Sequence, residues 1–389
     1  MTRGTRKRER EDHNSGTGTA QPRLPAEIME EILSRLPVKS LIRFQGVCKS
    51  WCNLFSDPRF ITMNLKQSTE TNRRSRLIIS TASTFYSVDL QAFDRAKRLH
   101  VPFPRPLGKI HVLGSCNGIV CLTLSQHEKR IHLWNPISRD FQDVPLRAFD
   151  LRYRRMFVGF GYNPTSDVYK IVQIYTFFDS SFKSTKTVVD VYKLQMNAHG
   201  RTHHLGEVEY EIKEDGTWLQ LSQAPGNRAL HWMARRRDDP YNHLSPEVLV
   251  SFDLEDEKFR EVQLPEPTKE SGGQLRLTSL DGCLSVFCIS YPWDVDVWVM
   301  KDYGLKHSWI KKLSFNVSDI ASGTKFFRPV GFGINGEVIV LDDIDGKSIF
   351  LYDPVSKRTR NVQIPGRTRY INTYVESLVA FRDADYVDG

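Results

Sequence analysis

The sequence predicts an α+β protein in two parts, a small bundle of three helices followed by an all-β, propeller-like domain of about six units. Apolar residues recur at helical spacing as far as Leu65. From Leu77 onward, short β-like runs alternate with turn residues, and related sequence features return about every fifty residues. The polar, charged segment Lys66–Arg76 predicts a linker between the two parts.

The charge distribution argues against a nucleic-acid-binding protein. The chain carries a formal net charge of +8, but residues 1–23 and residues 66–76 each hold +3 of it. Residues 77–389 are nearly neutral, so they have little excess positive charge with which to bind the phosphates of a nucleic acid. Residues 1–23 are therefore predicted to be a disordered basic tail, with a nuclear-import signal as the alternative.

The helical part spans residues 24–65. Its first helix is predicted in LPAEIMEEILSRL, where Pro25 suits the first helical position and Pro37 ends the helix. Leu24, Ile28 and Ile32 repeat every four residues and form an apolar stripe. Two short helices and a last turn are expected to follow: Ser40–Phe44, Val47–Phe55 and Asp57-Pro58.

This helical unit has more large apolar side chains than about forty residues can bury alone. Each such side chain gains ~1.5–3 kcal/mol when it is fully buried. We therefore expect part of the apolar surface to bind another protein.

The stretch LPAEIMEEILSRLPVKSLIRFQGVCKSWCNLFSDPRF resembles an F-box. The resemblance rests on the opening Leu24-Pro25, the spaced isoleucines, Leu36-Pro37 and the Val-Cys-Lys-Ser-Trp block that ends at Trp51. It implies docking onto the Skp-family adaptor of a ligase that also contains a cullin and a RING protein. It further implies that the interface or its supporting core comprises Leu24, Pro25, Ile28, Ile32, Leu36, Pro37, Leu41, Val47, Cys48 and Trp51. Phe44 and Leu54 are assigned to the core.

Two sequence patterns recur in the β region, residues 77–389. The first is a turn followed by an apolar run, and the second is a strand with a central aromatic residue that a turn connects to a polar strand. The apolar runs are anchored by Ile119, Leu230, Leu284 and Val338. The units are expected at residues 77–90, 110–146, 157–195, 217–264, 274–315 and 326–365. The strand Tyr374–Phe381 is expected to complete the first unit and close the ring, which removes unpaired edges. The alternative is a β-sandwich-like pair of sheets.

This region is also similar to the F-box-associated domain of plant F-box proteins, which looks related to kelch repeats. The similarity is carried by SCNGIVCL, LWNP, VGFGYNPTSDVYKIV, ALHWM, DVWVMKDYG and VGFGINGEVIVL. It implies a substrate-binding domain.

Known catalytic and metal-binding patterns are missing from the sequence. Cys116/Cys121 and Cys283/Cys288 have a C-x4-C spacing that would place them on opposite faces of a strand, and they are predicted to be buried hydrophobes rather than zinc ligands. His203-His204 is predicted to lie in a loop, and Asp281, Asp342 and Asp343 to serve turns. We therefore expect no metal, no cofactor and no catalytic residue, which makes the chain a non-catalytic subunit.

The predicted function is the substrate-recognition adaptor of a Skp–cullin–F-box ubiquitin ligase, in which the β domain binds an unidentified target protein for ubiquitination and degradation. The alternatives are a non-degradative F-box scaffold and a propeller hydrolase with a helical extension. Target-binding loops are expected at Thr176–Thr187, Met233–Glu247 and Ser290–Asp296. They supply the candidate substrate-binding residues Arg235, Arg236, Arg237, Tyr291 and Trp293.

The cellular location follows from cysteine usage and hydropathy. Six cysteines form no dense disulfide framework, so the reducing nucleus or cytoplasm is expected. The sequence contains no apolar run long enough to cross a membrane, so no membrane span is expected.

Overall fold

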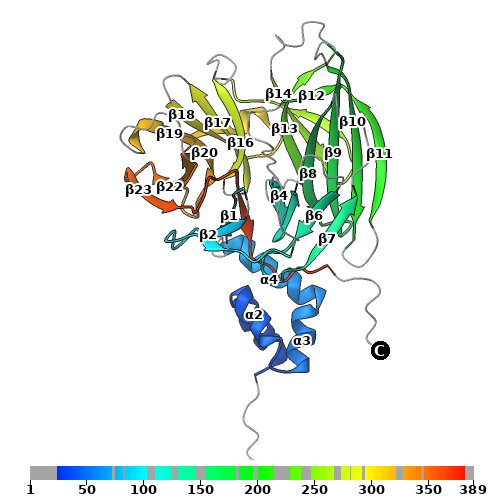
Figure 1. The fold of residues 1–389 in the computed structure, drawn as a ribbon, viewed down its shortest axis with the longest axis vertical. Helices are drawn as coiled ribbons and strands as arrows, with labels where there is room; N and C mark the ends of the chain where they lie inside the picture. Colours follow the sequence, from blue (N-terminus) through cyan, green and yellow to red (C-terminus); the bar gives the residue numbers. More distant parts are fainter. Residues whose placement is uncertain are drawn as a thin grey trace, which may run out of the picture.

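The computed structural model shows four helices followed by six four-stranded antiparallel sheets that form a propeller (Figure 1). The predicted fold class is confirmed, and the β-sandwich alternative is not what forms. The structure describes residues 24–71, 75–82, 84–102, 110–124, 130–145, 154–180, 184–195, 200–213, 228–237, 247–266, 273–280, 282–290, 294–320, 327–342 and 346–381.

The helices begin where the sequence provides suitable first residues. They are α1 (Ala26–Ser34), α2 (Val38–Phe44), α3 (Lys49–Ser56) and α4 (Pro58–Thr71). Pro25 and Pro37 occupy the N-cap positions of α1 and α2, where a missing N–H costs no helical hydrogen bond.

Helix α4 differs from the predicted last turn because it continues for 14 residues. Asp57 Oδ1 accepts a hydrogen bond from the Arg59 backbone N–H at 2.7 Å, and Pro58 is the first helical residue. The segment Lys66–Arg76, predicted as a linker, is helical as far as Thr71, and its last two residues begin strand β1.

Each sheet of the propeller contains four strands in antiparallel order. The strands of the first three sheets are β1 (Ser75–Ser80), β2 (Phe85–Asp89), β3 (Lys97–Arg98) and β24 (Tyr370–Val375); β4 (His111–Cys116), β5 (Ile119–Thr123), β6 (Arg130–Trp134) and β7 (Phe141–Pro145); β8 (Arg154–Asn163), β9 (Val168–Phe178), β10 (Ser184–Leu194) and β11 (Arg201–Val208). Those of the last three are β12 (Tyr210–Ile212), β13 (Ala229–Arg236), β14 (Val248–Asp253) and β15 (Phe259–Val262); β16 (Gln274–Leu280), β17 (Cys283–Ser290), β18 (Asp294–Met300) and β19 (Trp309–Asn316); β20 (Phe327–Phe332), β21 (Val338–Asp342), β22 (Ser348–Asp353) and β23 (Arg358–Gln363).

The ring is closed by the first and last strands of the propeller. β24 pairs antiparallel with β1, Ser75 opposite Val375 and Ser80 opposite Tyr370. β24 contacts β4 of the second sheet and β20 of the sixth, so the ring has no gap between its ends. The closing strand was predicted at Tyr374–Phe381, which is too far along the chain, because the residues after Val375 pack against the helical bundle instead.

Buried apolar clusters fill the spaces between neighbouring sheets. The four predicted anchors Ile119, Leu230, Leu284 and Val338 are completely buried, and each lies at or near the start of the second strand of its sheet. Cys116 and Cys121 lie on the successive strands β4 and β5 and share one cluster, so they are not on opposite faces of one strand as predicted. His203-His204 lies in strand β11 rather than in a loop, with His204 Nδ1 2.6 Å from Asp190 Oδ1.

The antiparallel order gives the propeller two distinct faces. Helix α4 precedes β1 in the chain, and the helical bundle lies at the Ser75 end of that strand (Figure 1). The turn after Ser80 and the loop that enters β24 at Tyr370 lie at the other end, because these two residues are paired. We call this second side the far face.

Candidate functional site

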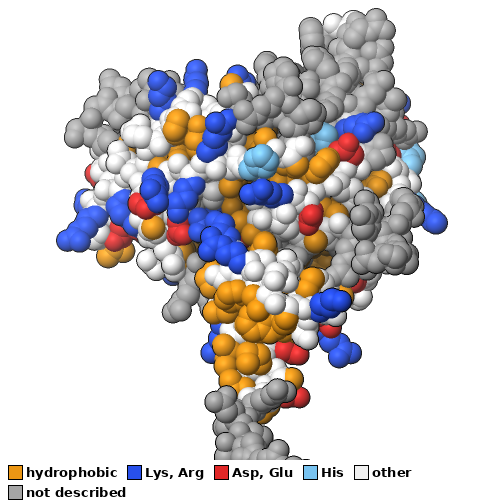
Figure 2. Space-filling model, turned by 60° about the horizontal axis from the view of Figure 1, so that its bottom comes forward, with side chains coloured by type: hydrophobic (Ala, Val, Ile, Leu, Met, Phe, Trp, Pro, Cys, Tyr) orange, Lys and Arg blue, Asp and Glu red, His pale blue; other side chains and the backbone are white. Residues whose placement is uncertain are grey.

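The exposed apolar surface of the helical bundle is its most distinctive feature. Leu24, Ile28, Ile32 and Val47 have exposed fractions of 55%, 45%, 48% and 64%. Figure 2 shows hydrophobic side chains covering the bundle where it projects from the propeller. Large apolar side chains seldom gather on a surface that only meets water, so this face is a candidate for protein binding.

The structure divides the ten predicted adaptor-binding residues between surface and core. Seven are exposed: Leu24, Pro25, Ile28, Ile32, Pro37, Val47 and Cys48. Leu41 is completely buried, and Leu36 is half-buried against the core of the bundle.

Trp51 belongs to the internal packing of the bundle. Its ring centroid lies 5.4 Å from that of Phe44 and 6.0 Å from that of Phe55. Phe44 and Leu54, which were assigned to the core, pack against the same cluster. Trp51 therefore supports the shape of the surface, and the exposed residues of α1 make its most accessible part.

The bundle has a core that is complete without the exposed stripe. Leu33, Val38, Leu41, Phe55 and Phe60 are buried together in it. In addition, the Asn64 side-chain amide donates to the Ser34 backbone carbonyl at 2.8 Å and ties α4 to the end of α1. The stripe is thus not needed inside the bundle and is available to a partner.

The C-terminal segment joins the bundle to the propeller. Leu378 packs into the core of the bundle beside Ile137, which lies in the turn between β6 and β7. Val379 packs into a propeller cluster beside Ile61 of α4. Asn135 Nδ2 donates to the backbone carbonyls of Ser377 and Val379 at 3.1 and 2.7 Å. We call residues 376–381 the junction segment.

Charged groups reinforce this junction. The Glu376 carboxylate has a side-chain exposure of 5% and lies 3.1 Å from Lys39 Nζ of α2 and 2.5 Å from Arg76 Nε of β1. Gly118 takes a φ of +83°, and a Cβ atom there would collide with Ser377. This junction was not predicted, because the whole of Tyr374–Phe381 was expected to form the closing strand. The signal that could have shown it is the polar pair Glu376-Ser377 within a largely apolar run.

The candidate substrate-binding arginines lie at the far-face end of β13. Arg236 is exposed but donates to both carboxylate oxygens of Glu261, at 2.7 and 2.6 Å. Arg237 donates to the backbone carbonyl of Val208 at 3.4 Å and to that of Thr185, and Arg235 is half-buried. These internal contacts leave less of the three side chains free for a target.

The other target-binding predictions are covered only in part. Tyr291 and Trp293 lie outside the described residues. The loop expected at Thr176–Thr187 is shorter, because β9 continues to Phe178 and β10 begins at Ser184.

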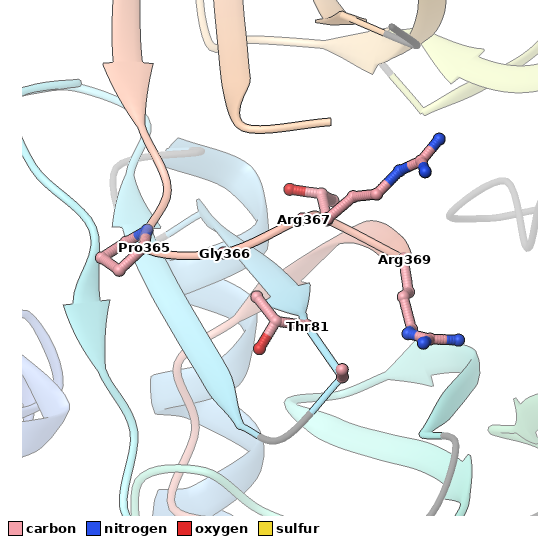
Figure 3. Close-up of a pocket in the computed structure, with 7 residues that line it drawn as sticks. Thr81, Pro365, Gly366, Arg367 and Arg369 are labelled. Carbon is pink, nitrogen blue, oxygen red and sulfur yellow. The ribbon is translucent and has the colours of Figure 1, made fainter. Parts of the chain in front are cut away.

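A pocket of about 310 Å³ opens on the far face between the turn after β1 and the loop before β24. The lining residues are Thr81, Ala82, Pro365, Gly366, Arg367, Thr368 and Arg369 (Figure 3). This pocket was not predicted from the sequence. The signal that could have shown it is the segment PGRTR, a turn with two arginines just before the last strand.

The cysteines and acidic groups give no sign of catalytic or metal chemistry in the described ranges. Burial raises the pKa of the Cys121 thiol well above its ordinary value, so this cysteine is held as an unreactive thiol. Within the described ranges, no three His, Cys, Asp or Glu side chains gather as metal ligands would. Asp342 ends β21, whereas Asp281 and Asp343 lie outside the described residues. Of the helices that the structure describes, none is long and apolar enough to cross a membrane.

Comparison with known proteins identifies both parts of the chain. A model of the F-box domain matches residues 22–62, and a model of the F-box associated beta propeller domain matches residues 67–384. F-box protein At3g07870 of Arabidopsis thaliana is 24% identical over 405 residues, which cover 93% of this chain and 92% of that protein. F-box protein CPR1 of the same plant is 28% identical, covering 88% of this chain and 84% of that protein.

F-box/kelch-repeat protein At3g23880, also of Arabidopsis thaliana, is 29% identical and covers 84% of this chain and 87% of its own length. Each of these three alignments covers more than four fifths of this chain and of the relative. The chain therefore belongs to the plant F-box proteins that carry a C-terminal F-box associated β-propeller domain.

Proposed function

We propose that this protein is the substrate-recognition subunit of a Skp–cullin–F-box ubiquitin ligase. The exposed stripe of α1 and the neighbouring Val47 dock on the Skp-family adaptor, and through it the chain joins the cullin and the RING protein. The propeller holds a target protein for ubiquitin transfer and degradation. The chain's own contribution is proximity, since the bond-forming chemistry belongs to other subunits.

The observation that carries this proposal is an apolar stripe left outside a bundle whose core is already filled. Leu24, Ile28, Ile32 and Val47 are about half exposed, so burying the rest of each against a partner would contribute roughly half of the ~1.5–3 kcal/mol that full burial gives. The total for the four is comparable with the lower estimates of the entropy lost on association, so further contacts of the partner must add to it.

The test replaces two of these residues with aspartate. The double variant Ile28→Asp/Ile32→Asp should lose co-purification with the adaptor, because two charges would have to be buried without partners. Its propeller should unfold at the parent temperature. Val355→Asp is the matched control, since Val355 is 93% exposed on the propeller and its replacement should leave adaptor binding unchanged. Full retention of adaptor binding by the double variant would rule out this docking surface.

Trp51→Ala tests the internal packing of the bundle, whereas the aspartate variants test its exposed surface. Trp51 packs between Phe44 and Phe55, so its loss opens a cavity in the bundle itself. The variant should weaken adaptor binding together with the stability of the bundle. The aspartate variants should weaken binding alone.

Degradation of the target is tested by comparing cells that contain the parent chain with cells that contain the double aspartate variant. Proximity labelling through the propeller, with and without proteasome inhibition, identifies the proteins that stay near it. A degraded target should accumulate near the parent chain only when the proteasome is inhibited, and near the variant in both conditions. A neighbour that is equally abundant in every condition would favour the non-degradative scaffold.

The proposed location is the nucleus or the cytoplasm, where the other ligase subunits would have to meet this chain. The hydrolase alternative would require turnover by the propeller. Both matching family models describe an adaptor motif and its associated propeller rather than an enzyme family.

A further inference from the structure

The far-face pocket has an unusual lining for a surface turn. Two of its seven lining residues are arginines, three are Thr81, Ala82 and Thr368, and none is acidic. Figure 3 shows the side chains of Arg367 and Arg369 leaving the loop in different directions, both away from Pro365. A pocket with this composition favours an anion.

Both guanidinium groups are free to bind. Arg367 and Arg369 are exposed, and in the part of the chain that the structure describes neither side chain has an ion-pair or hydrogen-bond partner. The backbone beneath them is fixed, because Thr368 N–H donates to Gly346 O at 2.6 Å and Arg369 N–H donates to Ser80 O at 2.8 Å. The loop that carries the two charges therefore has a fixed backbone, while the two side chains keep the freedom to turn towards a ligand.

The hydroxyl of Thr368 is a second, independent indication of a ligand. Thr368 is only 7% exposed, and its Oγ1 atom is buried without a hydrogen-bond partner. An unpaired buried hydroxyl costs about 1–3 kcal/mol, so such groups usually have a partner. Thr368 lines the pocket, where an oxygen of a bound anion would supply that partner.

A glycine turn and a neighbouring hydrogen bond shape the surroundings of the pocket. Gly366 takes a φ of +115°, a conformation that other residues adopt only with strain, and this shapes the turn beside Thr81. Arg98 Nε donates to Thr84 Oγ1 at 3.3 Å in the neighbouring turn. The positive charge of the pocket lining itself comes from Arg367 and Arg369.

We propose that this pocket binds an oxyanion carried by the target protein, either the phosphate of a modified Ser or Thr or the carboxylate of an Asp or Glu in an extended segment. The proposal rests on the proposed function, because it assigns the pocket to target recognition. Arg367 and Arg369 hold the anion through charge-assisted hydrogen bonds, and Thr368 Oγ1 donates a third. A phosphate is favoured over a carboxylate because its three oxygens match three donors.

The position of the pocket suits such a role. It lies where β1 ends, whereas the bundle lies where β1 begins, and six strand residues separate the two ends by about 17–20 Å. A target bound here would not compete with the adaptor for space. The predicted arginines at the end of β13 lie on the same far face and could extend the contact.

The test uses the full chain co-purified with the Skp adaptor and three fluorescent peptide pools. The pools have phosphothreonine, glutamate or threonine at a fixed central position and mixed residues elsewhere. Binding is measured by fluorescence anisotropy. The phosphothreonine pool should bind about tenfold or more tightly than the threonine pool, and the glutamate pool should be intermediate. Arg367→Gln/Arg369→Gln should bind all three pools equally weakly.

Two further variants make the result specific. Arg95→Gln/Arg358→Gln removes two exposed arginines outside the pocket and should leave binding of the phosphothreonine pool unchanged. Thr368→Val should weaken that binding without lowering the melting temperature, because the hydroxyl has no partner in the free protein. If Thr368 had only a structural role, Thr368→Val would lower the melting temperature together with the binding.

The outcomes distinguish this proposal from the proposed function. Equal binding of the three pools by the parent chain would overturn the anion site, and so would unchanged preference in the double arginine variant. Tighter binding of a single-stranded RNA than of any pool, lost in the same variant, would also overturn it in favour of a nucleic-acid site. Adaptor co-purification in every sample reports the ligase role separately.

Discussion

At the scale of single residues, the most consequential buried charge is Lys170 on β9. Its side chain is 5% exposed, and its Nζ atom lies 2.6 Å from Glu257 Oε1 and also donates to the Leu254 backbone carbonyl. Lys193 Nζ lies 2.8 Å from the same carboxylate oxygen. Glu257 therefore joins the third and fourth sheets by neutralising two lysines, and its removal would leave a buried ammonium group without an anion.

Glu257→Gln should lower the free energy of unfolding by about 2–3 kcal/mol at pH 7, because breaking a buried pair costs far more than losing an exposed one. Glu255→Gln is the matched control. Arg228 and Glu255 form a pair 3.0 Å apart with both side chains about half exposed, so this change should cost less than about 1 kcal/mol. Urea denaturation of the two variants measures the difference.

The same residue predicts a pH dependence. Burial on its own raises the pKa of Glu257, but hydrogen bonds from Lys170 and Lys193 outweigh it and hold the pKa below the ordinary value of 4.5. The ionised carboxylate therefore stabilises the fold above that value, and this contribution is lost as the pH falls through the lowered pKa. The stability gap between the parent and Glu257→Gln should shrink below about pH 4.5. A gap that stays constant down to pH 3 would contradict this role.

At the scale of elements, the junction segment should determine whether the bundle stays folded. Leu378→Ala removes a buried side chain from a core cluster shared by the bundle and the propeller, at a cost of about 2–5 kcal/mol. A bundle of this size has little stability to lose, so its helices should unfold before the propeller. Circular dichroism at a helical wavelength should show an early transition that calorimetry also detects. Leu305→Ala, at a leucine that is 47% exposed, should leave a single transition.

The strands and helices also show which parts of the fold can be predicted from sequence patterns. Repeated apolar runs anchored at residues such as Ile119 and Val338 predicted the propeller, because each unit repeats the same local pairing of strands. The closing strand and α4 were misplaced for a different reason. The run after Val375 is apolar because it contacts the distant bundle, and α4 is polar although Asn64 and Ser68 are buried. The end of the closing strand and the length of α4 both depend on contacts between residues far apart in the sequence, and a local sequence pattern carries no information about such contacts.

The same limit applies to the candidate site. The four-residue repeat of Ile28 and Ile32 predicted a stripe, but Leu33 lies on the same helix and is buried. Hydrophobicity alone cannot tell which of two apolar faces points outward. The pocket was missed because its arginines meet Thr81, nearly three hundred residues earlier, only through the pairing of β1 with β24.

At the scale of the whole molecule, packed and ionic contacts join the bundle to the propeller. Leu378 and Val379 pack on the two sides of the junction, and Glu376 lies between Lys39 and Arg76. For a ligase subunit, a fixed geometry restricts which surface of a bound target faces the incoming ubiquitin. We therefore expect the distance between the two parts to be single-valued in solution.

This expected rigidity can be tested with Cys52, one of the two cysteines that are exposed in the described part of the chain. Spin labels on Cys52 and on Val355→Cys, in a chain that also carries Cys48→Ser and Cys283→Ser, report the distance between α3 and the outer edge of the sixth sheet. The parent background should give one narrow distance distribution. Adding Leu378→Ala should broaden it, because the apolar contact that holds the bundle in place is lost. A broad distribution before Leu378 is changed would show that the ionic and apolar contacts at the junction do not fix the two parts, and target orientation would then have to come from other subunits.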